Sequence, residues 1–307
     1  MSFTAQDVKA LRDRTGCGMM DCKKALVEAN GDMDAAVDVL RELGLAKQAK
    51  KASRIAAEGV ALAITNDTNT AGVVIEVNSE TDFVAKNADF VAFVNTCAQT
   101  VMENDPADIE ALLALKAAGS DMTVAELLQE KVLTIGENIQ LRRFEKFDGP
   151  TVGYVHAGGK IGVLVNFDTD VDTTSADFVA CGKDVAMQIA ALNAPYLNSA
   201  EVPAEIIEKE KEILVSQMKQ DPKMANKPEQ VLAKIVEGKI GKYYKENCLV
   251  DQEFVKDGSM TVAKYVESVA KKLGGSINVA KFVRFEKGEG IEKRQDDFAA
   301  EVASMVK

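Results

Sequence analysis

Apolar residues recur at helical spacing along the first forty-odd residues, and this pattern predicts three short helices. Thr4 can cap the first helix, whose apolar stripe is formed by Val8 and Leu11. The turn at 15–18 ends that helix because we expect its two glycines to tolerate positive φ. The inward positions of the next two helices are Ala25, Leu26, Val37 and Leu40. So short a segment has a marginal core, and we expect a compact three-helix head over residues 1–45.

The head is followed by an alanine-rich, basic stretch without large apolar residues, AKQAKKASR at 46–54. Because such a stretch has no face to bury, we expect residues 46–58 to form a solvated linker. Two interpretations of its cations stay open, a plain tether between domains and a nucleic-acid patch.

Beyond the linker, one supersecondary unit occurs twice. AGVVIEV at 71–77 resembles IGVLVNF at 161–167, and three exact markers follow in the same order: ADFVA at 88–92 and 176–180, MTVA at 122–125 and 260–263, and RFEK at 143–146 and 284–287. Each copy reads as strands, a helix, a second helix that begins near MTVA, and a final strand. The fold class is therefore α+β, with two related core subdomains at 59–148 and at 149–202 plus 248–287.

The helices that follow the ADFVA markers have matching faces. Asn87 and Ser175 lie at the predicted N-caps. The apolar faces line up as Phe90, Cys97 and Val101 in the first copy and Phe178, Val185 and Ile189 in the second.

An insertion interrupts the second copy. Asp89 to Met122 spans 33 residues, whereas Asp177 to Met260 spans 83. The excess falls at 203–247, where prolines at 203, 222 and 228 mark a helix start and a turn. The apolar positions that we expect to face one another are Ile206, Ile213, Leu214 and Met218 in one helix and Val231, Leu232, Ile235 and Val236 in the other. This pattern predicts an antiparallel coiled-coil hairpin.

Composition and charge favour a cytoplasmic protein that binds other proteins. The net charge of −11 opposes non-specific binding to nucleic acid or to an anionic membrane. The five cysteines are scattered without a Cys-x-x-Cys pair, which fits a reducing cytosol. No targeting segment or apolar run of membrane-spanning length is present in the sequence. We expect no membrane and no direct nucleic-acid partner.

The chain is poorly supplied with catalytic chemistry. It has a single histidine, His156, and no tryptophan, and Gly158–Gly162 lacks the spacing of a phosphate-binding loop. We expect no catalytic residues, no metal and no cofactor. An enzyme that uses Cys22 or His156 is the least favoured alternative.

The loop at 78–86 also differs between the two copies. The matching loop at 168–174 is two residues shorter and has no aromatic residue, so the scaffold itself does not require Phe83. An aromatic side chain beside Asp82 is either a local packing residue or an anchor for a partner.

Four long segments resemble the elongation factor Ts family: TGCGMMDCKKAL at 15–26, TDFVAKN at 81–87, GYVHAGGKIGVLV at 153–165 and RFEKGEGIEK at 284–293. The resemblance implies a non-enzymatic guanine nucleotide exchange factor that binds elongation factor Tu, in its nucleotide-free and GDP forms, and releases GDP. It also implies that the head is a ubiquitin-associated-like domain and that 288–307 form a C-terminal helical module, both of which contact the GTPase domain of that partner.

The resemblance also assigns contact residues. It implies that Asp82 and Phe83 enter the GTPase domain, with Phe83 wedged between helices near the Mg²⁺ and phosphate site, and that His156 faces the partner's third domain. The implied wedge segment is Thr81, Asp82, Phe83 and Val84, and the other implied contacts are Arg12, Thr15, Gly18, Met19, Met20, His156, Gly159 and Ile161.

Two features depart from the family pattern: a longer turn at 221–228, and Ala157 where a glycine is usual. They leave open what the hairpin contacts, including a homodimer through the second core subdomain or the coiled coil. The alternative function is a non-enzymatic RNA- or stress-associated adaptor that uses the helical head and the basic linker.

Overall fold

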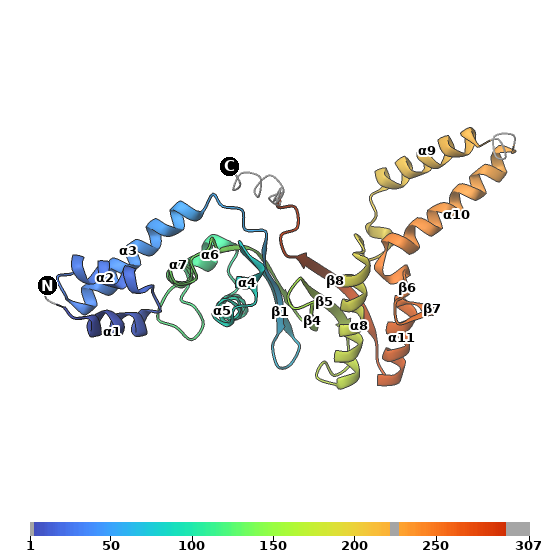
Figure 1. Cartoon of the computed structure of the whole chain (residues 1–307). Helices are drawn as coiled ribbons and strands as arrows, with labels where there is room; N and C mark the ends of the chain where they lie inside the picture. Colours follow the sequence, from blue (N-terminus) through green and yellow to red (C-terminus); the bar gives the residue numbers. More distant parts are fainter. Residues whose placement is uncertain (1–2, 222–226, 293–307) are drawn as a thin grey trace.

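The computed structural model describes residues 3–221 and 227–292. Figure 1 shows a helical head, a central body of helices and two sheets, and a projecting helical hairpin, which follow one another along the length of the molecule. The mixed helix-and-sheet composition confirms the predicted α+β class. None of the helices in the described ranges is both long and apolar enough to cross a bilayer. The turn at 222–226 and the tail at 293–307, on which two predictions fall, lie outside the described residues.

The head consists of α1 (Ala5–Thr15), α2 (Met19–Glu28) and α3 (Met33–Lys51). Thr4 caps α1 in a capping box, because its side chain accepts from the Asp7 amide while the Asp7 carboxylate accepts from the Thr4 amide. Of the two turn glycines, only Gly16 takes a positive φ, of 66°, whereas Gly18 is the extended N-cap of α2 with φ −61°. The turn therefore ends α1 as predicted and uses the tolerance of glycine for positive φ at Gly16.

The expected linker is helical up to Lys51, so its first half continues the head and is not a separate tether, whereas most of residues 46–55 are exposed to solvent as predicted. Helix α3 continues to Lys51 because its end consists of alanine, lysine and glutamine, which are strong helix formers, and tertiary contacts add to this. Lys47 pairs with Asp21 of α2 at 2.6 Å, and the Lys51 ammonium lies 3.4 Å from the backbone oxygen of Val132. These contacts attach the head to the body through a rigid element.

Two antiparallel sheets of three strands form the centre of the body. The first has the order β1-β2-β3 and the second β4-β5-β8. The strands are β1 (Glu58–Thr65), β2 (Ala71–Ser79), β3 (Gln140–Asp148), β4 (Thr151–His156), β5 (Ile161–Thr169) and β8 (Ile277–Glu286). The main helices are α5 (Ala88–Asn104) and α7 (Val124–Ile135) in the first copy and α8 (Ala176–Leu192) and α11 (Val262–Leu273) in the second. The shorter elements are α4 (Asp82–Ala85), α6 (Ile109–Ala114), η1 (Ser199–Glu201), η2 (Leu249–Asp251), β6 (Glu253–Phe254) and β7 (Asp257–Thr261).

The two copies match in detail. Asn87 and Ser175 cap α5 and α8, and the two predicted apolar faces of these helices are buried. Both central strands shift register at the equivalent position, between Glu76 and Val77 in β2 and between Asn166 and Phe167 in β5. A β-bulge that occurs at the same position in both copies is a defined part of the sheet and not a local irregularity. The repeat found in the sequence is thus a structural repeat, but its RFEK marker was wrong. Phe144 pairs with Ile75 of β2, whereas the equivalent residue of β5, Val165, pairs with Phe282 and not with Phe285.

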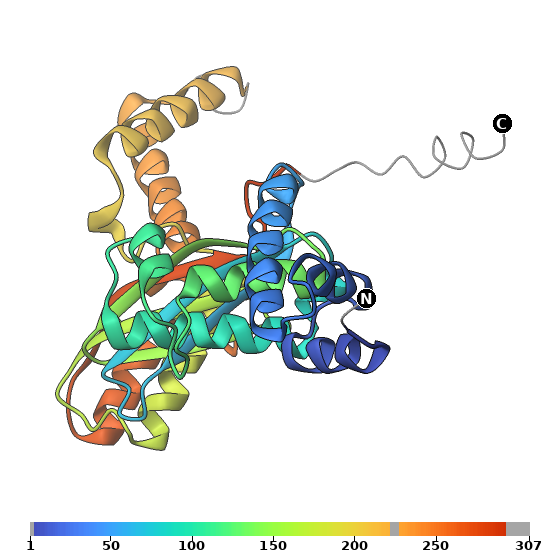
Figure 2. The same ribbon diagram turned by 90° about the vertical axis from the view of Figure 1, so that its left-hand side faces the viewer.

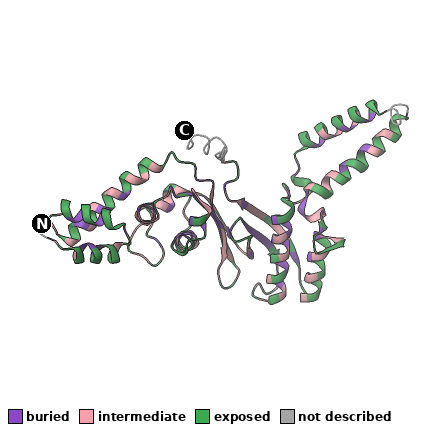
Figure 3. Ribbon diagram, in the orientation of Figure 1, coloured by how far each residue is buried: buried purple, intermediate pink, exposed green. Residues whose placement is uncertain are grey.

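The layers of the body run helix, sheet, sheet, helix. Figure 1 shows α5 and α7 on one side of the paired sheets and α8 and α11 on the other, and Figure 2 looks onto the α5 and α7 side. A small cluster joins the two sheets: Ala61, Val74, Phe147, Leu164 and Phe285. Because both faces of the central strands are covered, β2 and β5 are buried along most of their lengths, as the purple strands of Figure 3 show.

The insertion forms helices α9 (Ala204–Gln220) and α10 (Glu229–Asn247), which project from the second copy. Their shared apolar contact includes Ile207, Leu214, Met218, Val236 and Ile240. The predicted stripe was partly wrong, because Ile206, Ile213 and Val231 are exposed. In α9, Ile207 packs in this contact in place of its neighbour Ile206, which the prediction had placed there.

Candidate partner-binding site

Residues 80–85, which follow β2, support the exposed aromatic ring of Phe83, and we call this segment the mount of Phe83. Thr81 caps the four-residue helix α4, and its hydroxyl oxygen accepts from the Val84 amide at 3.3 Å. Val84 and Ala85 are buried in the core of the first copy. Phe83 points the other way and is 81% exposed, the highest fraction among the exposed large apolar side chains of the described residues. The ring is therefore not a local packing residue.

Two glutamates hold this mount from both sides. The Glu137 carboxylate, between α7 and β3, accepts from the Glu80 amide, the Thr81 amide and the Thr81 hydroxyl at 3.0, 3.0 and 2.7 Å. In return, the Glu80 carboxylate accepts from the Asn138 amide at 2.6 Å and from the Arg54 guanidinium at 3.4 Å. Hydrogen bonds to charged acceptors are stronger than neutral ones. The turn before Phe83 is thus fixed to the loop before β3.

Asp82 remains a charged group beside the ring. Its carboxylate accepts from the Lys86 ammonium at 2.7 Å, and this hydrogen bond together with the charge of Lys86 lowers the pKa of Asp82. Lys287 contributes in the same direction. The side chain is about half exposed, so the carboxylate is open to a partner.

The second copy shows what the scaffold needs by itself. At the end of β5, the Asp170 carboxylate accepts from the Ser276 amide at 2.6 Å, which repeats the contact between Glu80 and Asn138. Gly275 stands where the first copy has Glu137. The second copy also lacks a counterpart of α4 in its loop at 170–175, all of which is described. The short helix, the aromatic ring and the second glutamate are additions of the first copy.

The other predicted contact residues divide into exposed and buried ones. In the head, Met19 and Met20 are 44% and 61% exposed, and Arg12 and Gly18 are exposed as well. Thr15 is half buried, and its hydroxyl donates to the Leu11 carbonyl at 2.7 Å.

In the second copy, His156 is exposed at the end of β4, with Nδ1 3.0 Å from the Tyr154 hydroxyl. Gly159 and Ile161 are buried, and a Cβ added to Gly159 would lie 2.9 Å from Val60. Like the buried Val84, these two residues offer no side chain to a partner in this conformation.

Some of these sites lie along one edge of the body. The positive charge of Lys287 helps to lower the pKa of Asp82, and its ammonium group pairs with Glu58. The backbone amide of Lys287 donates to the Lys160 carbonyl in the turn after β4. The mount of Phe83, the segment after β8 and the turn after His156 are therefore neighbours. The head residues are not joined to them by a contact that the structure describes.

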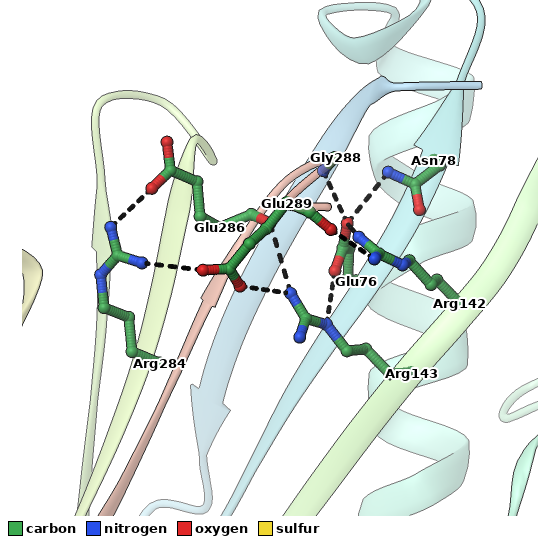
Figure 4. A network of polar contacts seen from close by, with 8 residues as sticks. All are labelled: Glu76, Asn78, Arg142, Arg143, Arg284, Glu286, Gly288 and Glu289. Carbon is green, nitrogen blue, oxygen red and sulfur yellow. Dashed lines mark hydrogen bonds and ion pairs between the residues drawn. The ribbon is translucent and has the colours of Figure 1, made fainter. Parts of the chain in front are cut away.

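A buried polar network was missed by the sequence reasoning (Figure 4). Glu76 of β2 is fully buried, and its carboxylate accepts from Arg142 at 2.9 Å, from Arg143 at 2.6 Å and from the Gly288 amide at 2.7 Å. Arg143 also pairs with Glu289 at 3.1 Å. The signal that could have revealed it was a glutamate inside an otherwise apolar central strand, AGVVIEV.

This network fixes the segment after β8 to the first copy. Burial alone would raise the pKa of Glu76, but the hydrogen bonds from Gly288, the two arginines and Asn78 together lower it. The carboxylate is therefore charged and fully engaged. A Cβ added to Gly288, whose φ is +68°, would collide with the backbone oxygen of Ala57 at 2.0 Å, so close packing requires glycine there.

Comparisons with known proteins show the family of the chain. A family model described as "Elongation factor TS" matches residues 80–289, which contain the mount of Phe83, the turn after His156 and the residues that donate to Glu76 from β3 and from the segment after β8. The chain is 50% identical to "Elongation factor Ts" of Syntrophotalea carbinolica over the whole of both chains. It is 49% identical to the proteins of that name from Clostridium perfringens and Clostridioides difficile, over at least 99% of each chain.

The chain belongs to the elongation factor Ts family.

Membership of the elongation factor Ts family implies nucleotide exchange on elongation factor Tu during translation elongation. The family assignment rests on nearly the full length of the relatives, so it covers the head and the hairpin as well as the body. Within the elongation factor Ts fold, the exposed ring on a rigid mount is the feature best placed to act on a partner.

Proposed function

We propose that this elongation factor Ts accelerates GDP release by inserting Phe83, with Asp82 beside it, into the GTPase domain of elongation factor Tu near the Mg²⁺ and phosphate site. The observation that carries the proposal is the 81% exposure of the Phe83 ring on a short helix whose next two residues, Val84 and Ala85, are buried. An exposed aromatic side chain on a rigid support loses little conformational entropy when it enters a partner pocket.

The energetic scale suits a wedge. Burying one phenylalanine yields about 1.5 to 3 kcal/mol. Because about 1.4 kcal/mol corresponds to a factor of ten, the ring alone could weaken nucleotide affinity by roughly one to two decades. Greater acceleration requires further contacts acting together with the ring.

Those contacts come from three other parts of the chain. We assign them to the exposed head residues Met19 and Met20, to His156, and to the C-terminal module at 288–307, of which 293–307 lie outside the described residues. In this proposal the head is a ubiquitin-associated-like domain and the hairpin of α9 and α10 an antiparallel coiled coil.

The coupling is reciprocal. A factor that weakens GDP binding must itself bind more weakly when GDP is present, so the entering nucleotide displaces it. The factor needs no covalent step of its own, and its place of action is the cytoplasm, where the partner GTPase works in translation.

The adaptor alternative has less support. It uses the helical head and the basic linker, but three of the four linker cations, Lys47, Lys51 and Arg54, make contacts within the chain. RNA binding with a steep salt dependence, together with no effect on GDP release, would favour it over exchange.

The test is stopped-flow release of fluorescent GDP from elongation factor Tu at increasing concentrations of the factor. We expect Phe83→Ala to lower the maximal release rate by about 10- to 100-fold, as the loss of one buried phenyl group implies. Val255→Ala removes another exposed apolar side chain, which is 45% exposed and lies between β6 and β7, and serves as the control. Unchanged acceleration by Phe83→Ala would refute the wedge role.

A further inference from the structure

Glu137 holds the turn that carries Phe83, although it lies 54 positions further along the chain. Its carboxylate receives both amides of the turn, from Glu80 and Thr81, and the Thr81 hydroxyl. Thr81 in turn caps α4 by accepting from the Val84 amide. A continuous series of hydrogen bonds thus runs from Glu137 to the helix that contains Phe83.

Helix α4 depends on such external support. It has only four residues, and a helix of that length is unstable by itself, because nucleation fixes many dihedral angles for few hydrogen bonds. Two supports are visible: Val84 and Ala85 anchor its inner side in the core, and Glu137 fixes its N-terminal end. The apolar anchor sets the depth of the helix, whereas the carboxylate sets the direction of the turn that leads into it.

The internal repeat provides a comparison within one molecule. The loop after β5, which carries no aromatic ring, keeps the contact between Asp170 and Ser276 and is also held by Thr173, whose hydroxyl donates to the Thr68 carbonyl at 2.6 Å. At the position equivalent to Glu137 the second copy has Gly275, where an added Cβ would lie 2.5 Å from Asp170 and 2.6 Å from Val171. The scaffold therefore does not need a carboxylate at this position. The carboxylate is found only in the copy whose loop carries the aromatic ring.

We infer that Glu137 is a positioning residue for nucleotide exchange, which acts through Thr81 to hold Phe83 in the orientation that enters the partner. This inference rests on the proposed wedge function of Phe83. Glu137 itself need not touch the partner: its contribution is that α4 is already formed and directed when the two proteins meet. Pre-organisation of this kind raises the rate of the step that uses the ring.

The experiment measures GDP release from elongation factor Tu by stopped flow with Glu137→Ala, Glu137→Gln and Phe83→Ala. The amide oxygen of glutamine can still accept from both backbone amides, so Glu137→Gln should restore most of the rate that Glu137→Ala loses. Glu137→Ala should lower the maximal rate by about 10- to 100-fold, the range expected from misplacing a reacting group by about 1 Å. Hydrogen exchange of the Thr81 and Val84 amides should become faster in the same variant.

Asp170→Ala is the matched control, since it removes two hydrogen bonds to Ser276 in the second copy and leaves the mount of Phe83 intact. It should lower stability to a similar degree without changing the maximal release rate. The double variant Glu137→Ala with Phe83→Ala should release GDP no more slowly than Phe83→Ala alone, because Glu137 acts through the ring.

The outcomes separate the two claims. If Phe83→Ala keeps full activity, the wedge itself is wrong. If Phe83→Ala is impaired while a folded Glu137→Ala is not, the wedge survives and the positioning role is wrong. The positioning role also fails if the losses of the two single variants add in the double variant, or if Asp170→Ala slows release as much as Glu137→Ala.

Discussion

The Gly288 amide donates a 2.7 Å hydrogen bond to the buried carboxylate of Glu76, a residue 212 positions earlier in the chain. This contact joins the end of the second copy to the central strand of the first, three residues before that strand ends. Since β2 leads directly into the turn that carries Phe83, the same strand supports both the segment after β8 and the exchange loop. The two halves are thereby held as one body.

Replacing Glu76 by alanine should destabilise the fold strongly. The change leaves the partly buried guanidinium groups of Arg142 and Arg143 without their shared carboxylate. Breaking a buried ion pair by removing one partner costs about 3 to 5 kcal/mol. Urea denaturation monitored by circular dichroism measures the change in the free energy of unfolding. Glu145→Ala, an exposed glutamate on β3, should shift it by less than about 0.5 kcal/mol; a similar small shift for Glu76→Ala would show that the network does not stabilise the fold.

We expect the contribution of the Glu76 carboxylate to the free energy of unfolding to be lost in acid. The pKa of Glu76 is lowered in the folded protein from its usual value of 4.5. A group with a depressed folded pKa contributes stability that is present above the unfolded value and is lost as pH falls through the folded one. The difference in unfolding free energy between the wild type and Glu76→Gln should therefore shrink as the pH is lowered from about 6 to about 3. A difference that stays constant over this range would mean that the charge of Glu76 contributes nothing.

Gly182→Ala should destabilise the protein even though alanine is the better helix former. Gly182 lies in α8 against β4, and an added Cβ would meet the Cγ2 and Cβ atoms of Val152 at 2.4 and 2.6 Å. Overpacking of this kind costs about 1 to 3 kcal/mol. Gly238 in α10 has nothing within 4 Å of an added Cβ, so Gly238→Ala should instead stabilise by about 0.5 to 1 kcal/mol. Thermal melts of the two variants test this prediction. The packing argument is wrong if both substitutions shift the melting temperature in the same direction.

The repeat could be predicted from sequence because its markers coincide with local physical signals. Asn87 and Ser175 are N-caps, and the apolar residues that follow them have helical spacing. Such signals lie within a few residues of one another, so they can be seen without knowledge of the tertiary fold. The helix propensity of the alanine, lysine and glutamine residues at the end of α3 was a local signal that the prediction of a linker overlooked. The contacts of this end with Asp21 and Val132 could not be predicted, because those residues lie far away in the chain.

The hairpin shows a second limit. Ile206 and Ile207 are adjacent apolar residues, and so are Ile213 and Leu214. Neighbours on a helix are rotated by about 100° from each other, so the sequence does not decide which of a pair faces the partner helix. The structure buries Ile207 and Leu214.

The candidate site was only partly visible in the sequence. Comparing the two copies singled out Phe83, because the second loop lacks an aromatic residue. Glu80, Glu137 and Glu76 were missed, because a glutamate in an acidic chain looks like a solvated surface residue until its donors are known. Their donors are backbone amides and arginines brought close by the fold.

The turn after His156 provides the last prediction. Ala157 takes a φ of +48°, in the left-handed region that disfavours residues with a Cβ. Relieving this strain is worth about 1 to 2 kcal/mol, from which the greater flexibility of glycine in the unfolded chain subtracts about 0.4 to 1 kcal/mol. Ala157→Gly should therefore raise the unfolding free energy by about 0.5 to 1 kcal/mol. Gly158→Ala, in the same turn at φ +64° and with nothing within 4 Å of the added Cβ, should lower it by a similar amount. Chemical denaturation of both variants tests the pair, and a stabilising Gly158→Ala would show that backbone strain does not govern this turn.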